Sequence, residues 1–315
     1  MPRRLAVSVG FTGNPEQNKE IINRIKVAEE VGVEAVFTAE TWGRDQFSLL
    51  TQIALQTSKI KFGTGIAPVF GRSPAVLAMT AATLDELSGG RMILGLGTSG
   101  DRVIEHWHGE KFSKPIQRTK EYIEIINMMV SGEKVFYDGQ IYKLQRGFKL
   151  LFEPPRKHIP IYVASISPKS MQSLATAAGA AGRAEDAVEC VASITVVINP
   201  DEQKAKVQAA GPISWYVTNM GDFYHEMLTR NGFGEEVAAM RKVAETHKPP
   251  PFGTNPELMA AMGEKMLEET AVWGDLETVA AGIEERRKLG VDLPSISMPQ
   301  GPLDQVERIL GTLVS

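Results

Sequence analysis

The sequence has a single cysteine, Cys190, among its 315 residues. One cysteine excludes a disulfide framework and a metal centre built from several thiolates. Cys190 leads into an apolar run, and free cysteine packs as a small hydrophobic residue, so we expect a buried structural thiol. A reducing compartment, the cytoplasm, fits this composition.

Long apolar runs and strong charge are also lacking. No apolar run reaches the roughly 18–20 residues that a membrane-spanning helix needs. No cleavage site of small residues follows the short apolar run after Arg4, so we expect no signal peptide. The formal net charge of −4 is too small to indicate binding to nucleic acid or to a membrane surface. We therefore expect a cytoplasmic protein that binds neither nucleic acid nor a membrane.

What the sequence does contain is a regular alternation of strand and helix patterns. Strands are predicted at 5–11, 35–40, 60–69 and 91–96, and the first three are each followed by a helical pattern. This alternation predicts a parallel α/β sheet with right-handed crossovers. Further strands are predicted at 159–165, 193–198 and 294–299.

Three connecting regions complete the predicted organisation. Residues 101–114 read as a polar loop, and Asp138-Gly139 predicts the turn of an inserted hairpin. Extra helices are predicted before the last strand. No linker of biased composition interrupts the chain, so we expect one domain over residues 1–315.

The predicted strands number seven, whereas a (β/α)8 barrel has eight. Only 27 residues lie between Ser165 and Ser193, which leaves little room for a helix, a strand and another helix. An open sheet of seven strands would leave two unpaired edges. We therefore predict that the printed sequence omits residues near Thr176 to Gly182, where the sixth strand would lie.

Gly95 to Gly100 match the pattern G-x-G-x-x-G. A Rossmann site requires a helix that opens at the third glycine and an acidic residue about 20 positions later. Here the glycines close the fourth strand, which argues against that fold. Two interpretations stay open: a tight turn, or a turn that lets a planar ring or a phosphate approach the backbone. The same two interpretations apply to Gly63 to Pro68.

Glu40 ends the second predicted strand. A carboxylate at such a strand end is a candidate acid, base or binding group. The alternative is an ion pair with Arg44 or Arg72. His106 and His108 have no third ligand nearby in the sequence, so we predict no metal site.

Six segments carry a resemblance to a known family: Ala39–Asp45, Gly63–Ile66, Thr83–Arg91, Leu94–Gly100, Trp107–Gly109 and Ile161–Ala164. Together they resemble the luciferase-like flavin and deazaflavin oxidoreductases. The most specific of them is the helix ending Thr-Leu-Asp-x-Leu-Ser-x-Gly-Arg. The fourth-strand ending Gly-Leu-Gly-x-Ser-Gly resembles the branch that uses the deazaflavin coenzyme F420, together with the methylene-tetrahydromethanopterin reductases.

The resemblance implies a TIM (β/α)8 barrel that binds a deazaflavin at the carboxyl ends of its strands. It implies a non-prolyl cis peptide bond between Gly65 and Ile66 that backs the ring. The other implied cofactor contacts are Thr98, Ser99 and Gly100 with the ring or ribityl chain, and Ala164, Ser165, Ile166 and Ser167 with the phosphate. The residues Phe11, Trp42 and Trp107 are candidates for the substrate pocket. The family's Asp-Gly-Trp sixth strand is not found, which again suggests missing residues.

The resulting functional hypothesis is an F420-dependent oxidoreductase. It would transfer a hydride between C5 of the deazaflavin and a small organic substrate, with Glu40 handling a proton or orienting a group. A homodimer is expected. The positions of the acid/base pair of the family's sugar-phosphate dehydrogenases hold Thr41 and Gly100, so that substrate is not expected. Two alternatives stay open: an FMN-dependent monooxygenase, and a non-catalytic protein that binds flavin or F420.

Overall fold

The structure is a computed structural model that describes residues 3–10, 14–166, 171–172, 188–220 and 222–315. Residue contacts divide the chain into two compact units. The first comprises Met1–Ser165 with Met298–Ser315, and the second comprises Ile166–Ser297. That residues 1–315 form one barrel domain stays a prediction. The stretch from Thr176 to Gly182, where we predict omitted residues, lies outside the described residues.

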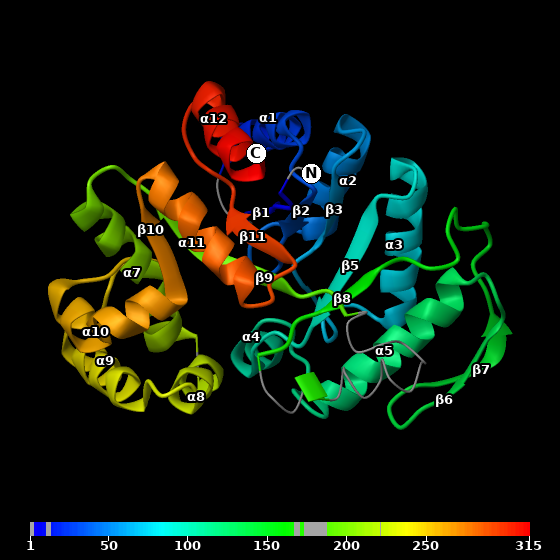
Figure 1. Ribbon diagram of the computed structural model, residues 1–315. Helices are drawn as coiled ribbons and strands as arrows, with labels where there is room; N and C mark the ends of the chain where they lie inside the picture. The colour runs from blue at the N-terminus through cyan, green and yellow to red at the C-terminus, as the bar shows by residue number, and fades with distance from the viewer. Residues whose placement is uncertain (1–2, 11–13, 167–170, 173–187, 221) are drawn as a thin grey trace. The chain divides into compact units, whose positions relative to one another are not determined.

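The first unit is built on a parallel sheet in the order β1-β2-β3-β5, with β4 and β8 both paired to β5 (Figure 1). Its strands are β1 (Ala6–Val9), β2 (Ala35–Thr38), β3 (Lys61–Thr64), β4 (Ala67–Pro68), β5 (Met92–Gly97) and β8 (Ile161–Val163). Its helices are α1 (Pro15–Val31), α2 (Gln46–Gln56), α3 (Pro74–Ser88), α4 (Asp101–His106), α5 (Pro115–Val130) and α12 (Leu303–Val314). The predicted alternation of strand and helix is thus confirmed in this unit.

Local sequence signals explain the ends of α3. The Ser73 side chain accepts a hydrogen bond from the Val76 N–H, and Pro74 occupies the first turn, where its missing N–H costs nothing. Gly89 ends the helix with φ 69°, a left-handed conformation that favours glycine. Between these caps, Leu77, Ala78, Ala81 and Ala82 are fully buried.

The polar loop predicted for residues 101–114 is wrong at its beginning, because Asp101–His106 forms the helix α4. Two adjacent apolar residues, Val103 and Ile104, are buried there. Their burial stabilises a short helix, which the polar composition of the segment did not indicate.

The predicted hairpin is confirmed, with β6 (Val135–Asp138) antiparallel to β7 (Lys143–Phe148). Its loop is longer than the two-residue turn that Asp138-Gly139 indicates, since Asp138 pairs with Lys143. The buried carboxylate of Glu121 on α5 accounts for the longer loop. It accepts hydrogen bonds from the N–H groups of Gln140, Ile141 and Tyr142.

The second unit has a parallel sheet in which β9 (Val191–Ile198) pairs with both β10 (Ala271–Gly274) and β11 (Leu293–Ser297). Its helices are α7 (Glu202–Asn219), α8 (Asp222–Arg230), α9 (Gly234–Thr246), α10 (Pro256–Thr270) and α11 (Leu276–Lys288) (Figure 1). A buried cluster that includes Val217, Met240 and Met266 joins α7, α9 and α10.

Two sequence-based expectations fail in the second unit. Ala271–Gly274 is a strand rather than part of a helical region, because these four residues pair with Thr195–Ile198 far away in the chain. Cys190 is exposed rather than buried. It lies just before β9, where its N–H donates to Asp292 Oδ2 and its carbonyl oxygen accepts from the Asp292 N–H. Among the described residues, no helix combines the length and apolarity needed to cross a membrane.

Glu34, just before β2, gives the fold a testable dependence on pH. Arg4 donates hydrogen bonds of 2.6 and 2.8 Å to its carboxylate, and Lys61 donates one of 3.0 Å. These contacts, with Arg4 foremost, lower the pKa of Glu34 from 4.5 to about 2. Because the unfolded chain takes up this proton first as the pH falls, the contribution of Glu34 to stability is present above pH 4.5 and is lost between 4.5 and about 2.

We therefore expect Glu34→Gln to be less stable than the wild type at neutral pH, and this difference to shrink as the pH falls through that window. Urea denaturation at a series of pH values measures it. Glu30→Gln, at an exposed position on α1, is the matched control and should show no such change. A stability difference that is constant with pH would contradict the argument.

Candidate functional site

The predicted site residues of the first unit follow neighbouring strands. In a parallel sheet the carboxyl ends of adjacent strands meet at one edge, where α/β proteins place their ligands. Backbone hydrogen bonds tie these ends together: Gly65 N–H to Thr38 O at 2.6 Å, Val69 N–H to Gly97 O at 2.9 Å and Ala164 N–H to Leu96 O at 2.8 Å. Residues that follow β2, β3, β5 and β8 therefore form one continuous edge.

The peptide bond between Gly65 and Ile66 is cis, at the position for which the family resemblance implies it. The side chain of Ile66 packs over Gly97, where an added Cβ would lie 2.7 Å from Ile66 Cγ1 and 3.2 Å from Ala164 Cβ. Glycine at this position thus allows the ends of β3, β5 and β8 to approach one another. Ile66 lies in the middle of the edge.

The end of β5 forms a turn with an unusual backbone. Ser99 has φ 57°, in the left-handed region, and the Thr98 hydroxyl donates to Ser99 O at 3.2 Å. Gly100 follows as the residue before α4, and a Cβ added to it would meet nothing within 4 Å. The backbone is therefore open to an approaching group at Gly100.

Only some of the remaining predicted site residues lie at this edge. Ala164 and Ser165 follow β8 at the same edge, whereas Ile166 begins the second unit. Ser167 and Phe11 lie outside the described residues. The side chains of Trp42 and Trp107 are 51% and 63% exposed, respectively.

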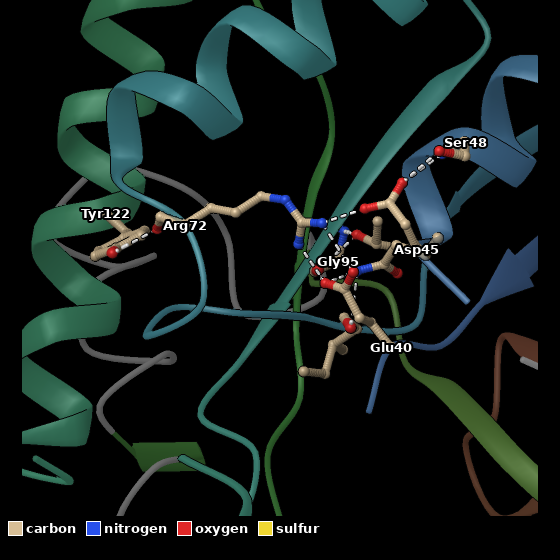
Figure 2. Close-up of polar contacts among 9 residues, drawn as sticks. Glu40, Asp45, Ser48, Arg72, Gly95 and Tyr122 are labelled. Atoms are coloured by element: carbon tan, nitrogen blue, oxygen red, sulfur yellow. Dashed lines mark hydrogen bonds and ion pairs between the residues drawn. The ribbon is translucent and has the colours of Figure 1, made fainter. Parts of the chain in front are cut away.

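Glu40 follows β2 and is held in an ion pair (Figure 2). Arg72 binds both oxygens of its carboxylate, with Arg72 Nη2 2.8 Å from Glu40 Oε1. The same guanidinium also binds Asp45, whose carboxylate caps α2 by accepting a bond from Ser48 N–H at 2.7 Å. The sequence left open whether Glu40 pairs with Arg44 or with Arg72, and the structure contains the ion pair with Arg72.

The electrostatics of this cluster favour fully charged groups. The hydrogen bond to Glu40 raises the pKa of Arg72, and Asp45 raises it further, against the opposite effect of burial. Burial by itself would raise the pKa of Asp45, but hydrogen bonds from Ser48 and the charge of Arg72 outweigh it and lower the pKa. At neutral pH Arg72 and Asp45 are therefore both charged.

Gln46, the first residue of α2, is a site residue that the sequence did not reveal. It is 1% exposed, and its Nε2 donates to Glu40 Oε2 at 3.2 Å and to Ile66 O at 3.4 Å. A polar residue directly after a cap aspartate usually faces solvent. Gln46 is therefore recognised as a site residue only by its burial in the structure. Arg72, in contrast, was one of the two ion-pair partners that the sequence offered for Glu40.

Three buried polar atoms near the end of β2 have no hydrogen-bond partner among the described residues: Thr38 Oγ1, Thr41 Oγ1 and Gln46 Oε1. Buried polar groups are nearly always hydrogen-bonded. A hydroxyl can donate and an amide oxygen can accept, so this region is suited to a ligand that presents both kinds of group. A search of the described residues finds no group of three or more histidine, cysteine or acidic side chains arranged to hold a metal ion.

Comparison with protein families gives one match, to the luciferase-like monooxygenase family, over residues 5–179 and 171–293. The chain belongs to this family. It is thus an oxidoreductase of the luciferase-like class, as the sequence motifs predict. The two matched stretches overlap between residues 171 and 179, which includes the beginning of the segment from Thr176 to Gly182 where we predict omitted residues.

Two relatives of this family member span most of its length. One, from Mycobacterium tuberculosis, is named provisionally as a coenzyme F420-dependent oxidoreductase and is 28% identical over 353 positions, 99% of each chain. The other, a 5,10-methylenetetrahydromethanopterin reductase of Archaeoglobus fulgidus, is 29% identical over 88% of this chain and 89% of its own. Because 353 positions exceed the 315 residues of the chain, the mycobacterial relative has residues that this sequence lacks. Their position stays a prediction.

A solved structure confirms the predicted fold class. The coenzyme F420-dependent tetrahydromethanopterin reductase of Methanopyrus kandleri matches 100% of this chain and 99% of its own, with a TM-score of 0.80 at 24% identity. The chain therefore has the α/β fold of a luciferase-like TIM-barrel enzyme. It also contains the antiparallel hairpin β6–β7.

Proposed function

We propose that the protein is an F420-dependent oxidoreductase that transfers a hydride between C5 of the deazaflavin and a small organic substrate. The observation that carries this proposal is the shared edge at the ends of β3, β5 and β8. There Ile66, the open turn at Gly100 and the end of β8 at Ala164 lie together. The relatives named for F420 support the choice of cofactor.

The residues of this edge fit the proposed cofactor. Ile66 would back the ring, Thr98 to Gly100 would border the ring or ribityl chain, and the backbone at Ala164 and Ser165 would face the phosphate. The family resemblance adds Ile166 and Ser167 as expected phosphate contacts. The unpartnered hydroxyl groups of Thr38 and Thr41 can each donate or accept, which suits a ring with both hydrogen-bond donors and acceptors. When bound, F420 supplies a two-electron centre that accepts or donates a hydride. The protein's part is to orient the ring and the substrate and to exclude water.

An FMN-dependent monooxygenase is the second candidate. The description of the matched family favours it, as does a solved Baeyer–Villiger monooxygenase in complex with FMN, with a TM-score of 0.66. Titration of the purified protein with F420 and with FMN, followed by fluorescence, separates the two candidates. Preferential binding of F420, and hydride turnover with imine, enone or alcohol substrates, is the expected result. Binding of FMN alone would overturn the proposal.

We also propose that the protein is a homodimer, which sedimentation analysis of the purified protein would test.

Gly100→Ala tests where the cofactor lies. An alanine Cβ would meet no protein atom within 4 Å, so the fold should tolerate it at a cost of about 1 kcal/mol or less. A methyl group between the turn and the cofactor should weaken F420 binding by about tenfold or more, which corresponds to 1.4 kcal/mol. Gly311→Ala on α12, also without a contact within 4 Å, is the matched control. Unchanged F420 affinity of Gly100→Ala would exclude this turn from the site.

A further inference from the structure

Both carboxylate oxygens of Glu40 accept hydrogen bonds from the protein itself. Arg72 Nη2 donates to its Oε1 at 2.8 Å, and Arg72 Nη1 and Gln46 Nε2 both donate to its Oε2. Its side chain is 10% exposed. A carboxylate that accepts three hydrogen bonds, two of them from a guanidinium, is an anchored anion. A general base instead needs an oxygen within reach of the substrate.

Gln46 connects this anion to the wall of the site. Its side-chain amide donates to Glu40 Oε2 at 3.2 Å and to the carbonyl oxygen of Ile66 at 3.4 Å. The Ile66 carbonyl belongs to the residue that follows the cis bond. Through these bonds the end of β2, the start of α2 and the segment after β3 share one amide group.

Arg72, which binds the Glu40 carboxylate, is held in place by three further contacts. Arg72 binds the Asp45 carboxylate, and its guanidinium lies 4.8 Å from the centre of the Phe47 ring. The Arg72 carbonyl accepts a hydrogen bond of 2.8 Å from the hydroxyl of Tyr122, a fully buried residue of α5. Figure 2 shows Arg72 reaching from Tyr122 on one side to Glu40 and Asp45 on the other. The Glu40 carboxylate therefore has little freedom to move.

We propose that Gln46 is a positioning residue that holds the Ile66 carbonyl, and with it the wall behind the bound cofactor, in place. Glu40 and Arg72 are its anchor, and Glu40 carries no proton in the reaction. The identity of the ligand rests on the proposed function. The assignment of roles rests on the hydrogen bonds alone.

Gln46→Met tests the proposal. Methionine has a similar length but no N–H to donate, so the Ile66 carbonyl loses this hydrogen bond. The change also removes the buried, unpartnered Oε1, but it leaves Glu40 Oε2 and the Ile66 carbonyl without this donor, so we expect a loss of about 1–3 kcal/mol in stability. We expect F420 to bind about tenfold more weakly or worse, an effect of 1.4 kcal/mol or more, measured by fluorescence titration. The KM of the organic substrate should change far less than the F420 affinity.

Gln52→Met on the same helix is the matched control. Gln52 is exposed, and its side-chain oxygen accepts a hydrogen bond of 3.4 Å from Asn18 Nδ2 on α1. Its F420 affinity should equal that of the wild type. If Gln46→Met is stably folded and binds F420 within about twofold of the wild type, less than 0.5 kcal/mol, the proposal is wrong while the proposed function stands. Wild-type protein that binds no F420 overturns both.

Glu40→Gln separates positioning from proton transfer, and serves as well should Gln46→Met fail to fold. Glutamine keeps the shape of Glu40 and an oxygen that Arg72 can bind. Positioning predicts that kcat falls by less than about tenfold, whereas the loss of an acid or base typically costs about 10²-fold to 10⁴-fold. A loss of the larger size, without a matching loss of F420 affinity, would overturn the assignment.

Discussion

Gly95→Ala is expected to prevent the first unit from folding stably. An alanine Cβ at this position would lie 1.9 Å from Thr64 O and 3.0 Å from Thr64 C, so it would overlap the backbone of the neighbouring strand. Thr64 cannot easily retreat. Its hydroxyl donates to Gly95 O at 2.7 Å and accepts from Gly95 N–H at 2.8 Å, and β3 is held on its other side by β2.

These two bonds to the Thr64 side chain replace the backbone hydrogen bonds that would otherwise continue between β3 and β5. The register between β3 and β5 runs from Phe62 to Gly63, after which the Thr64 hydroxyl takes over and the chain turns into the cis bond at Gly65. Close approach at Gly95 thus permits the geometry of the site edge. Overpacking of this severity should cost about 4 kcal/mol or more.

Urea denaturation and the yield of folded protein measure this effect. The control is Gly311→Ala, which meets no atom within 4 Å inside α12 and should be neutral or stabilising by about 0.5–1 kcal/mol. Thr64→Ser, which keeps the hydroxyl, should retain most of the stability. A Gly95→Ala protein as stable as the wild type would mean that β3 and β5 do not approach as closely as described.

Features that depend on neighbouring residues could be predicted from the sequence. The helix from Pro74 to Ser88 is fixed by a serine cap, a proline in the first turn and a glycine after the end, all within a few positions of one another. Glycines at the ends of β3 and β5 likewise indicated where another group would approach the backbone. The resemblance added the position of the cis bond, which periodicity alone does not specify.

Features that depend on distant residues could not be predicted. The bond between Arg72 and Glu40 joins residues 32 positions apart, and neither neighbourhood indicates which arginine is the partner. Gln46 looked like an ordinary helix residue, since nothing local reports that it faces Ile66. The strand β10 was missed for the same reason: its four residues become a strand only by pairing with β9. The polar network of the site therefore required the structure.

Arg91→Ala is expected to have the second large effect, at the opposite edge of the sheet. Arg91 ends the motif most specific to the family and precedes β5. Its guanidinium donates five hydrogen bonds of 2.8 to 2.9 Å, to Ala54 O, Thr57 O, Thr57 Oγ1, Ile60 O and Ser88 O. It thereby satisfies carbonyl groups at the end of α2, which have no partner within the helix. Removing it should destabilise the protein by about 3 kcal/mol or more, because hydrogen bonds to charged groups contribute about 1.5–3 kcal/mol each and are not additive.

Arg91→Lys sharpens the prediction, because one ammonium group has three donors and cannot reach all of these oxygens. Its stability should fall between those of Arg91→Ala and the wild type, whereas Arg146→Ala at an exposed position of β7 should match the wild type. Since Arg91 precedes β5 and the predicted cofactor contacts follow it, the fraction of Arg91→Lys that folds should bind F420 with wild-type affinity. Weaker binding by fully folded protein would instead place this motif in the chemistry of the site. Wild-type affinity with reduced stability would mean that this motif supports the fold rather than the cofactor site.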